Sequence, residues 1–387
     1  MLEDSLSAEL AEIQAAGLTR RRRVLDSPAG RIATVNGKNV LNFASNDYLG
    51  LAGNADIARA LADGALRWGA GSGASHLVSG HLTPHDELEN ALAAFTGFER
   101  ALTFSTGYLA NLAVTPTLAG RGDAVFADKL NHASLIDAMQ LAKANGADVQ
   151  RYPHNDVAAL ERQLAASSAT RKLIVTDAVF SMDGDLAPLP LLFALAERYD
   201  AWLVIDDAHG FGVLGPQGKG SLAHFNLPAS KRILLMGTLG KAAGVGGAFV
   251  VGSATAIDYL LNKGRSYIFT TAAPPAIACA LSKSLDIIRD GDALRAALMA
   301  NIARLRDGLA GHPLRLLPSA TAIQPLIVGD NAAAVALSSA LWERGLWVPA
   351  IRPPTVPKGT ARLRISVSAA HTAADIDLLV STLKELA

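Results

Sequence analysis

The chain has 387 residues, of which 50% are hydrophobic and 18% are charged. Thirty-five basic residues balance 35 acidic ones, so the formal net charge is zero. This balance gives no reason to expect nucleic acid or an anionic membrane as a partner, because both attract an excess of Lys and Arg. The length suffices for one large domain and a smaller one.

The first residues, MLEDSLSAEL, are acidic where a secretory signal is basic and then apolar. No apolar run approaches the roughly 20 residues that cross a bilayer. We therefore expect a soluble, cytoplasmic protein with no membrane partner. The single cysteine, Cys279, cannot form an internal disulfide, and its apolar surroundings favour burial.

The N-terminal residues predict a helix and a hairpin. Apolar residues recur at helical spacing over residues 3–18. A basic run, Arg20 to Arg23, follows, and such runs are typical of a solvated face. Two short strands, 32–35 and 40–43, flank Asn36-Gly37, which is a strong signal for a tight hairpin turn.

Two polar or glycine-rich stretches come next. Residues 42–50, NFASNDYLG, contain Asn and Asp residues of the kind that make turns. Residues 69–80 contain four glycines among small residues, which permits a backbone that approaches a ligand closely. A helix then begins at Thr83-Pro84, with Thr83 expected as its N-cap.

From residue 101 onward, short apolar strands alternate with helical patterns. The alternation predicts a mainly parallel, seven-stranded sheet with helices on both faces. The short connection before the last strand favours an antiparallel neighbour there. The expected strands are 101–104, 124–127, 149–152, 172–176, 202–206, 233–236 and 248–251, and the expected helices are 107–114, 131–144, 156–166 and 189–199.

The last third of the chain predicts a smaller α+β domain. Two helices, 275–289 and 292–310, lead into it. Its expected strands are 322–328, 346–350 and 362–367, and its expected helices are 331–344 and 372–386. We expect an N-terminal helix and hairpin segment over 1–45, a large domain over 46–280 and a small C-terminal domain over 281–387.

Three residues near the ends of two predicted strands, Asp206, His209 and Lys241, are candidates for binding a cofactor. Lys241 follows the strand ILLM within a glycine-rich bend, and Asp206 ends the strand AWLVID. A carboxylate at a strand end and a lysine beyond a later strand match the needs of pyridoxal phosphate. The lysine holds the aldehyde and the carboxylate keeps the pyridine nitrogen protonated. Taken singly, Lys241 fits a surface loop, Asp206 a turn and His209 a satisfied polar residue.

The stretches VIDDAHGFGVLGPQGKG and TLGKAAGVGG resemble the cofactor segments of the α-oxoamine synthases, which are fold-type I pyridoxal phosphate enzymes. That family condenses an amino acid with an acyl thioester and releases carbon dioxide. Further matching segments run from Asn42 to His371, so the resemblance covers nearly the whole chain. It implies a fold-type I transferase that forms a homodimer with shared active sites.

The resemblance assigns roles to individual residues and implies no metal. Lys241, His132 and Asp206 would be catalytic, with His132 stacked on the pyridine ring. Thr271 would meet the phosphate of the neighbouring subunit's cofactor. The residues expected to bind the cofactor are Gly107, Tyr108, His132, Ser181, Asp206, His209, Thr238, Lys241 and Thr271.

The stretches IQPLIVGD and IRPPTVPKGTARLRISVSAAHT look most like the biotin-pathway branch of the family. That branch joins L-alanine to a pimeloyl thioester, carried on coenzyme A or on acyl carrier protein, to give 8-amino-7-oxononanoate. Arg362 and Arg364 alternate with apolar residues on a strand, where a role in the site and a structural role are equally compatible. The residues expected to bind substrate are Arg21, Asn46, His132, Arg352 and Thr355.

Several alternatives remain open at this point. Within the family, 2-amino-3-ketobutyrate ligase, 5-aminolevulinate synthase and serine palmitoyltransferase use another amino acid or acyl chain. An aminotransferase could share Lys241 and Asp206. A cofactor-binding regulator without catalysis would normally carry a DNA-binding module, but only about 40 residues precede the core and they contain no basic recognition helix.

Overall fold

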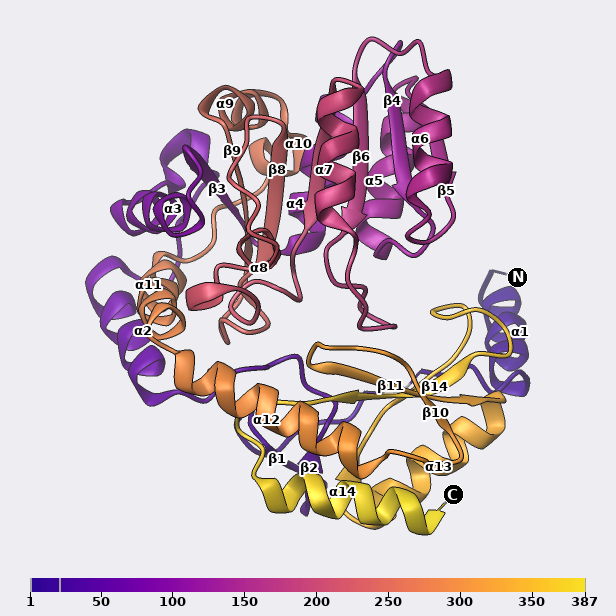
Figure 1. Ribbon diagram of the computed structural model, residues 1–387. Coiled ribbons are helices and arrows are strands. Elements are labelled where there is room, and N and C mark those ends of the chain that lie inside the picture. The colour runs from indigo at the N-terminus through magenta and orange to yellow at the C-terminus, as the bar shows by residue number, and fades with distance from the viewer. Residues whose placement is uncertain (1, 21, 387) are drawn as a thin grey trace.

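The computed structural model describes residues 2–20 and 22–386. A large domain surrounds a seven-stranded sheet, and a smaller domain with its own antiparallel sheet lies against one end of it (Figure 1). None of the helices among the described residues is both long and apolar enough to cross a membrane.

The large sheet has the strand order β3-β9-β8-β7-β6-β4-β5. All neighbours are parallel except β9, which runs antiparallel to both β3 and β8. The predicted mainly parallel sheet and its antiparallel last strand are both confirmed. The strands are β3 (Arg100–Phe104), β4 (Ala124–Asp128), β5 (Asp148–Tyr152), β6 (Lys172–Asp177), β7 (Ala201–Asp206), β8 (Ile233–Thr238) and β9 (Ala248–Gly252).

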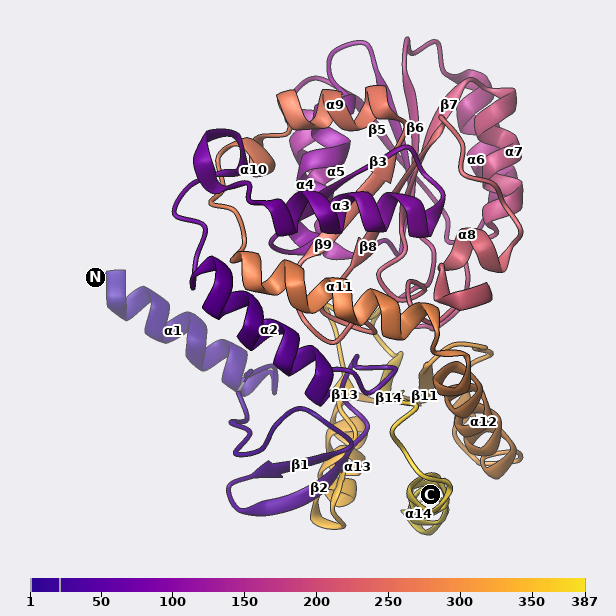
Figure 2. The ribbon, with the colours of Figure 1, turned by 90° about the vertical axis from the view of Figure 1, so that its left-hand side faces the viewer.

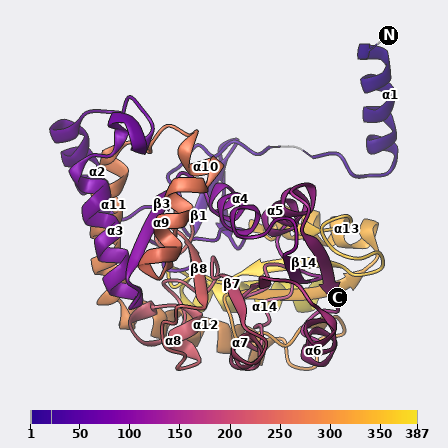
Figure 3. The same ribbon diagram turned by 90° about the horizontal axis from the view of Figure 1, so that it is seen from above.

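Helices cover both faces of this sheet, as its apolar strands require. Alternate strand residues divide between two buried clusters, with Phe126 and Ile205 in one and Val125 and Val204 in the other. Figure 3 shows α4 and α5 on one side of the strands and α6 and α7 on the other. These four helices are α4 (Gly107–Leu118), α5 (Ala133–Ala144), α6 (Val157–Ala166) and α7 (Leu189–Arg198).

The other helices of the large domain lie around its edges. The long helix α11 packs along α2 and α3 beside the sheet (Figure 2). The sequence patterns did not single out α2, α8, α9 or α10. The bounds are α2 (Ala55–Trp68), α3 (Thr83–Thr96), α8 (Ser221–His224), α9 (Ala254–Lys263), α10 (Arg265–Ile268) and α11 (Pro275–Arg289), with a single π-helical turn, η1 (His76–Gly80), and a 3₁₀ turn, η2 (Pro216–Gly218).

The small domain is built on a four-stranded antiparallel sheet in the order β10-β11-β14-β13. The N-terminal hairpin joins this end of the molecule, because β2 pairs in parallel with β12. The strands are β1 (Ile32–Val35), β2 (Lys38–Asn42), β10 (Arg315–Leu316), β11 (Ile323–Gly329), β12 (Leu346–Trp347), β13 (Ala350–Ile351) and β14 (Ala361–Ser366), and the helices are α12 (Asp292–Gly308), α13 (Asn331–Glu343) and α14 (Ala373–Leu386). The proposed boundaries near residues 45 and 280 stay a prediction.

Two local predictions need correction. Helix α3 has Leu82 rather than Thr83 as its N-cap, because the His85 imidazole Nδ1 accepts the Leu82 N–H at 3.0 Å. The predicted strand 346–350 is split into β12 and β13, which join different sheets. The predicted N-terminal helix is present as α1 (Leu2–Ala15), but it buries none of its residues and projects from the body of the molecule (Figure 3).

Candidate active site

A cavity of about 180 Å³ lies at the carboxyl ends of β6, β7 and β8. Ligands of open α/β sheets collect at this edge, because the strand ends and the helix N-termini meet there. Seven of the predicted site residues line the cavity. The lining consists of Gly107, Tyr108, Asn111, His132, Ser134, Asp177, Asp206, Ala208, His209, Met236, Thr238 and Lys241.

Lys241 lies in a fixed turn and not on a flexible loop. The Gly244 N–H donates to the Lys241 carbonyl at 2.9 Å, and the Leu239 N–H donates to the Gly247 carbonyl at 2.8 Å. Gly244 has φ +72°, and a Cβ there would lie 2.5 Å from backbone atoms of Leu51 and Ala52, so only glycine fits. Burial lowers the pKa of the Lys241 amine to about 8, although the Asp206 and Asp177 carboxylates oppose the shift.

A chain of hydrogen bonds fixes the position of the amine. Lys241 Nζ lies 2.9 Å from His209 Nε2, and His209 Nδ1 lies 2.6 Å from the Tyr48 hydroxyl. The Tyr48 hydroxyl in turn donates to Asn46 Oδ1 at 3.1 Å. Burial, reinforced by the Lys241 charge, lowers the pKa of His209 well below its ordinary value, so the imidazole is neutral. A neutral His209 can accept from Lys241 and donate to Tyr48 at once.

Asp206 is buried at the end of β7 and is held by two donors. Its Oδ1 accepts the Ala208 N–H at 3.0 Å, and its Oδ2 accepts Asn111 Nδ2 at 2.8 Å. The Asn111 Oδ1 atom is buried and has no hydrogen-bond partner among the described residues. Since an unpaired buried acceptor is costly, the cavity suits a ligand with a donor near Asp206.

His132 caps helix α5 and is fixed at two points. Its backbone N–H donates to Asp177 Oδ2 at 2.7 Å, and its Nδ1 lies 2.7 Å from the Ser134 hydroxyl. The register of β6 and β7 places Asp177 directly opposite Asp206. Burial, together with the neighbouring Asp206 charge, raises the pKa of Asp177 well above its ordinary value. Two carboxyl groups so close together favour a cationic ligand.

The N-terminus of α4 provides donors for an anion. Thr106 caps the helix, with its side chain accepting the Leu109 N–H and its carbonyl accepting the Ala110 N–H. The N–H groups of Gly107 and Tyr108 come before these and have no carbonyl within the helix to donate to. Both residues line the cavity, so their amides and the helix dipole suit a phosphate group.

Six predicted residues are not among those that line this cavity, and five of them are described by the structure. Ser181 contributes its carbonyl to Arg364, and Thr271 lines a separate cavity of about 370 Å³. Arg352 donates to the Gly17 carbonyl, and the Thr355 N–H donates to the Arg352 carbonyl at 3.1 Å. Asn46 is linked to the cavity residue His209 only through Tyr48, whose hydroxyl donates to Asn46 Oδ1. The sixth, Arg21, lies outside the described residues.

Arg364, which the sequence left open, lies beside the site as a buried cation. Its guanidinium donates to neutral oxygens of Ser181, Ser366 and Asn46, and among the described residues it forms no ion pair. Its charge helps to lower the pKa of Lys241, after burial and against two carboxylates. Arg362, two residues earlier on β14, instead pairs with Asp183 at 2.6 Å. Arg364 can therefore form an ion pair with an anionic ligand, whereas Arg362 is already paired with Asp183.

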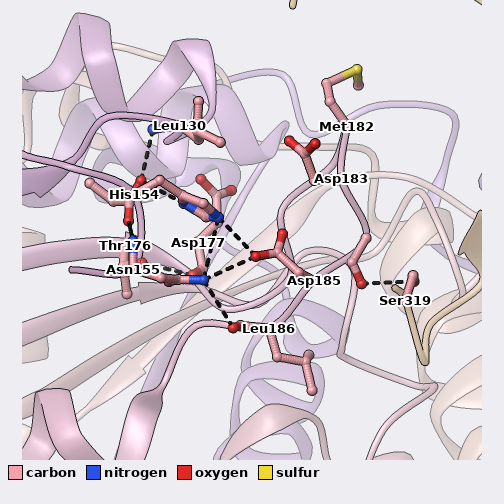
Figure 4. A network of polar contacts seen from close by, with 12 residues as sticks. Leu130, His154, Asn155, Thr176, Asp177, Met182, Asp183, Asp185, Leu186 and Ser319 are labelled. Atoms are coloured by element: carbon pink, nitrogen blue, oxygen red, sulfur yellow. Dashed lines mark hydrogen bonds and ion pairs between the residues drawn. The ribbon is translucent and has the colours of Figure 1, made fainter. Parts of the chain in front are cut away.

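The segment 181–186, which carries Ser181, is held by both domains (Figure 4). On the large-domain side, His154 bridges Asp128 at 3.0 Å and Asp185 at 2.8 Å, and Asn155 Nδ2 also donates to Asp185. On the small-domain side, the Ser319 hydroxyl donates to the Gly184 carbonyl at 2.9 Å. The segment therefore sets where β14 and its arginines lie relative to the cavity.

Sequence reasoning missed Asn111, Asp177 and Tyr48. Asp177 offered the same signal as Asp206, a carboxylate at the end of an apolar strand. Asn111 is a lone amide within the apolar helix α4. Only the fold brings Tyr48 to His209, 161 residues away along the chain.

Comparison with known proteins places these features in a family. The family model described as aminotransferase class I and II matches residues 38–383. The 8-amino-7-oxononanoate synthase of Dechloromonas aromatica is 84% identical over 387 residues and covers 100% of both chains. That of Herminiimonas arsenicoxydans is 62% identical and covers 99% of both.

Two solved structures show the same fold. A serine palmitoyltransferase from S. paucimobilis with bound PLP and myriocin superimposes with a TM-score of 0.92 at 32% identity, covering 99% of this chain and 96% of that one. An 8-amino-7-oxononanoate synthase from Francisella tularensis gives a TM-score of 0.77 at 30% identity, covering 89% and 97%.

Proposed function

Because this chain belongs to the 8-amino-7-oxononanoate synthases, within the class I and II aminotransferase family, we propose that it joins L-alanine to a pimeloyl thioester. The products are 8-amino-7-oxononanoate, carbon dioxide and the free thiol, on the route to biotin. The chain is a fold-type I transferase that depends on pyridoxal phosphate. The observation that carries the proposal is the cavity in which Lys241, Asp206 and His132 meet.

The donors and acceptors of the cavity fit the cofactor. Asp206, with the unpaired Asn111 Oδ1 beside it, suits a protonated pyridine nitrogen. The amides of Gly107 and Tyr108 suit the phosphate, and Lys241 suits the aldehyde. When bound, pyridoxal phosphate supplies a ring that withdraws electrons from the α-carbon of the amino acid.

Lys241 acts as the base and acid of the reaction. With a pKa of about 8, roughly a tenth of the amine is neutral at pH 7 and can take the α-proton of alanine. His209 holds Nζ at 2.9 Å, so the amine stays in place whether it carries the proton or not. The same group can later return a proton to the product. His132, fixed by Ser134 and Asp177, holds one wall of the cavity rigid.

Arg364 and Asn46 are proposed to hold the carboxylate of alanine. The guanidinium is buried, bears a full charge and has only neutral partners. A carboxylate would supply the missing counter-charge, and the planar fork of arginine favours paired hydrogen bonds. Asn46 Oδ1 already links Arg364 to Tyr48 and so to the lysine.

The far end of the acyl chain is assigned to Arg21 and Arg352, with Thr355 nearby. Arg352 reaches the Gly17 carbonyl, so it lies against the chain segment that leads to Arg21. Replacing Arg352 by Ala should raise KM for a pimeloyl thioester but not for an uncharged acyl chain of equal length. Whether coenzyme A or acyl carrier protein delivers the chain is decided by comparing kcat/KM for the two thioesters.

Product identification tests the assignment directly. The purified enzyme is given alanine, glycine or serine together with pimeloyl, acetyl, succinyl or palmitoyl thioesters, and the products are identified by mass spectrometry. Alanine with pimeloyl thioester should give 8-amino-7-oxononanoate at the highest kcat/KM. A preference for glycine with an acetyl thioester, or for serine with a palmitoyl thioester, would contradict the proposal.

A further inference from the structure

Three histidines cluster outside the active-site cavity. His76 lies in the π-helical turn η1, His81 follows it, and His85 lies in the first turn of α3. One ring nitrogen from each lies within 4.8 Å of the others, and among the described residues no other trio of His, Cys, Asp or Glu meets this criterion. The Nδ1 atoms of His76 and His81 are 2.8 Å apart.

The three imidazoles are suited to metal ligation. The rings lie close together, with centroids 5.1 Å apart for His76 and His81, 5.1 Å apart for His76 and His85, and 5.6 Å apart for His81 and His85. Neutral imidazole is the form that binds a metal ion. Tyr267 stacks on His76 at 5.1 Å between ring centroids and holds the ring in orientation.

We propose that His76, His81 and His85 bind a divalent transition-metal ion of the Zn²⁺ type. Zn–N bonds of about 2.0–2.1 Å place the nitrogens of a tetrahedral site roughly 3.3 Å apart, so modest side-chain rotations close the cluster around an ion. Three protein ligands leave a fourth position for water. The three histidines lie outside the cavity that holds Lys241 of the same chain.

His85 has contacts that both favour and oppose the ion. Its Nε2 lies 2.8 Å from the Ala273 carbonyl, the kind of second hydrogen bond that orients most metal-binding histidines. Its Nδ1 accepts the Leu82 N–H at 3.0 Å, and an ion must take over this lone pair. Within residues 2–20 and 22–386, the rings of His76 and His81 have no backbone partner, so an ion has to replace only the contact between their own Nδ1 atoms.

Metal binding would act on the segment that follows α10. Thr271 forms an isolated β-bridge with Ser75, and the Ser72 hydroxyl donates to the Ala273 carbonyl at 2.5 Å. His85 contacts the same carbonyl. An ion held by the three histidines would therefore fasten η1 and α3 to residues 271–273, and the loaded protein should unfold at a higher temperature.

The test uses the holoenzyme, freed of metal with a chelator and dialysed against Zn²⁺. Elemental analysis should find one zinc ion per chain, bound in the micromolar range or tighter. His76→Ala and His81→Ala should each weaken binding at least tenfold, and the double variant should abolish it. His85 is left intact because it also supports the backbone of α3.

His224→Ala is the matched control, since His224 is an exposed histidine on α8 outside the cluster. It should retain one zinc ion with unchanged affinity and the same rise in melting temperature. Zinc retained equally by the wild type and the double variant would overturn the proposal, as would no zinc retained by the wild type. Product formation is measured separately, so that failure of the metal site and failure of the proposed function are distinguishable.

Discussion

Lys241 combines two properties that rarely occur together in a lysine, a fixed position and a lowered pKa. The turn at Gly244 fixes its backbone, and burial lowers the pKa of the amine to about 8. Raising the pH through 8 therefore increases the neutral, basic fraction of the amine. We expect the rate of cofactor attachment to apoenzyme to rise with an apparent pKa near 8, as followed by the absorbance of the attached cofactor.

Replacing Lys241 by Ala should abolish the covalent attachment of the cofactor and turnover, because both need the amine. The measurement is borohydride reduction followed by peptide mapping. In the wild type the reduced cofactor should be found on the peptide that contains Lys241. A cofactor mapped to another lysine would overturn the assignment of the whole site.

Asp206 and Asn111 form a pair whose members can be tested separately. Asp206→Asn should preserve the fold but severely reduce turnover, since a neutral amide cannot hold a pyridinium proton electrostatically. Asn111→Ala removes the donor to Asp206 Oδ2 but keeps the carboxylate charge, so it should reduce turnover less than Asp206→Asn does. Steady-state kinetics and the absorbance spectrum of the bound cofactor report both effects. Near wild-type activity in Asp206→Asn would mean that another group holds the proton.

Arg364 and Arg362 make a matched pair on one strand. Loss of a charge-assisted hydrogen bond costs roughly 1.5–3 kcal/mol, or about 10- to 150-fold. Arg364→Ala should therefore raise KM for alanine by about this factor and change KM for the pimeloyl thioester much less. Arg362→Ala removes the ion pair with Asp183 and should lower stability more than it changes KM for alanine. Equal effects of the two variants on KM for alanine would mark Arg364 as structural.

Residues with a strong local signal were predictable, and residues brought in by the fold were not. Lys241, Asp206, His132 and His209 follow strands whose ends had to meet at one sheet edge, and they do share one cavity. Arg364 could not be separated from Arg362, because alternation along a strand gives both arginines the same pattern. Only the acidic partner of Arg362, 179 residues away in sequence, distinguishes the two.

At the scale of elements, predictions held where one pattern determined the structure. The central strands β4 and β7 are almost wholly buried, so each appears as an apolar run that ends in a carboxylate. Residues 346–350 also form an apolar run, but its two ends pair with different sheets. The run is therefore divided into β12, which pairs with β2, and β13, which pairs with β14. The N-cap of α3 was misplaced because Leu82, and not Thr83, has the extended backbone of a cap residue (φ −95°, ψ 163°), and the His85 side chain accepts the Leu82 N–H.

The segment 181–186 is an element whose anchoring depends on pH. Burial opposes the charged form of His154, but hydrogen bonds to Asp128 and Asp185 raise its pKa to about 10. A histidine with a raised folded-state pKa contributes stability that is complete below its unfolded value, near 6.5, and is lost as the pH rises towards 10. His154→Gln should therefore destabilise the protein at pH 6 and much less at pH 10.

Urea unfolding of both proteins at the two pH values measures this difference. A loss of stability of equal size at pH 6 and pH 10 would show that His154 acts through packing against Phe180, which its ring contacts at 4.3 Å, and not through its charge.

At the scale of the whole molecule, one pairing escaped sequence reasoning. The N-terminal hairpin joins β12, more than 300 residues away, and so belongs in space with the C-terminal part of the chain. Local patterns predicted each hairpin strand, because Asn36 and Gly37 both adopt the positive φ that a tight turn requires. No local pattern indicates which distant strand lies alongside, since the outer edge of a hairpin strand offers the same backbone donors and acceptors to any strand.

Thr271 lines a separate cavity and not the one that holds Lys241 of its own chain, and this motivates the proposal of a homodimer with shared sites. In such a dimer each site takes Lys241 from one subunit and Thr271 from the other. Thr271→Asp would place a negative charge beside the cofactor phosphate and should inactivate both sites, as Lys241→Ala does. In a mixed dimer of the two variants, one site has both native residues and the other has neither.

Co-expressing the two variants with different affinity tags tests this arrangement. Random pairing makes about half of the dimers mixed, so the co-expressed enzyme should regain about a quarter of wild-type activity. Mixed dimers purified through both tags should reach about half, because one of their two sites is intact. A site contained within one chain would regain nothing, since every chain then lacks one of the two residues. Full activity of Thr271→Asp alone would instead remove Thr271 from the phosphate site.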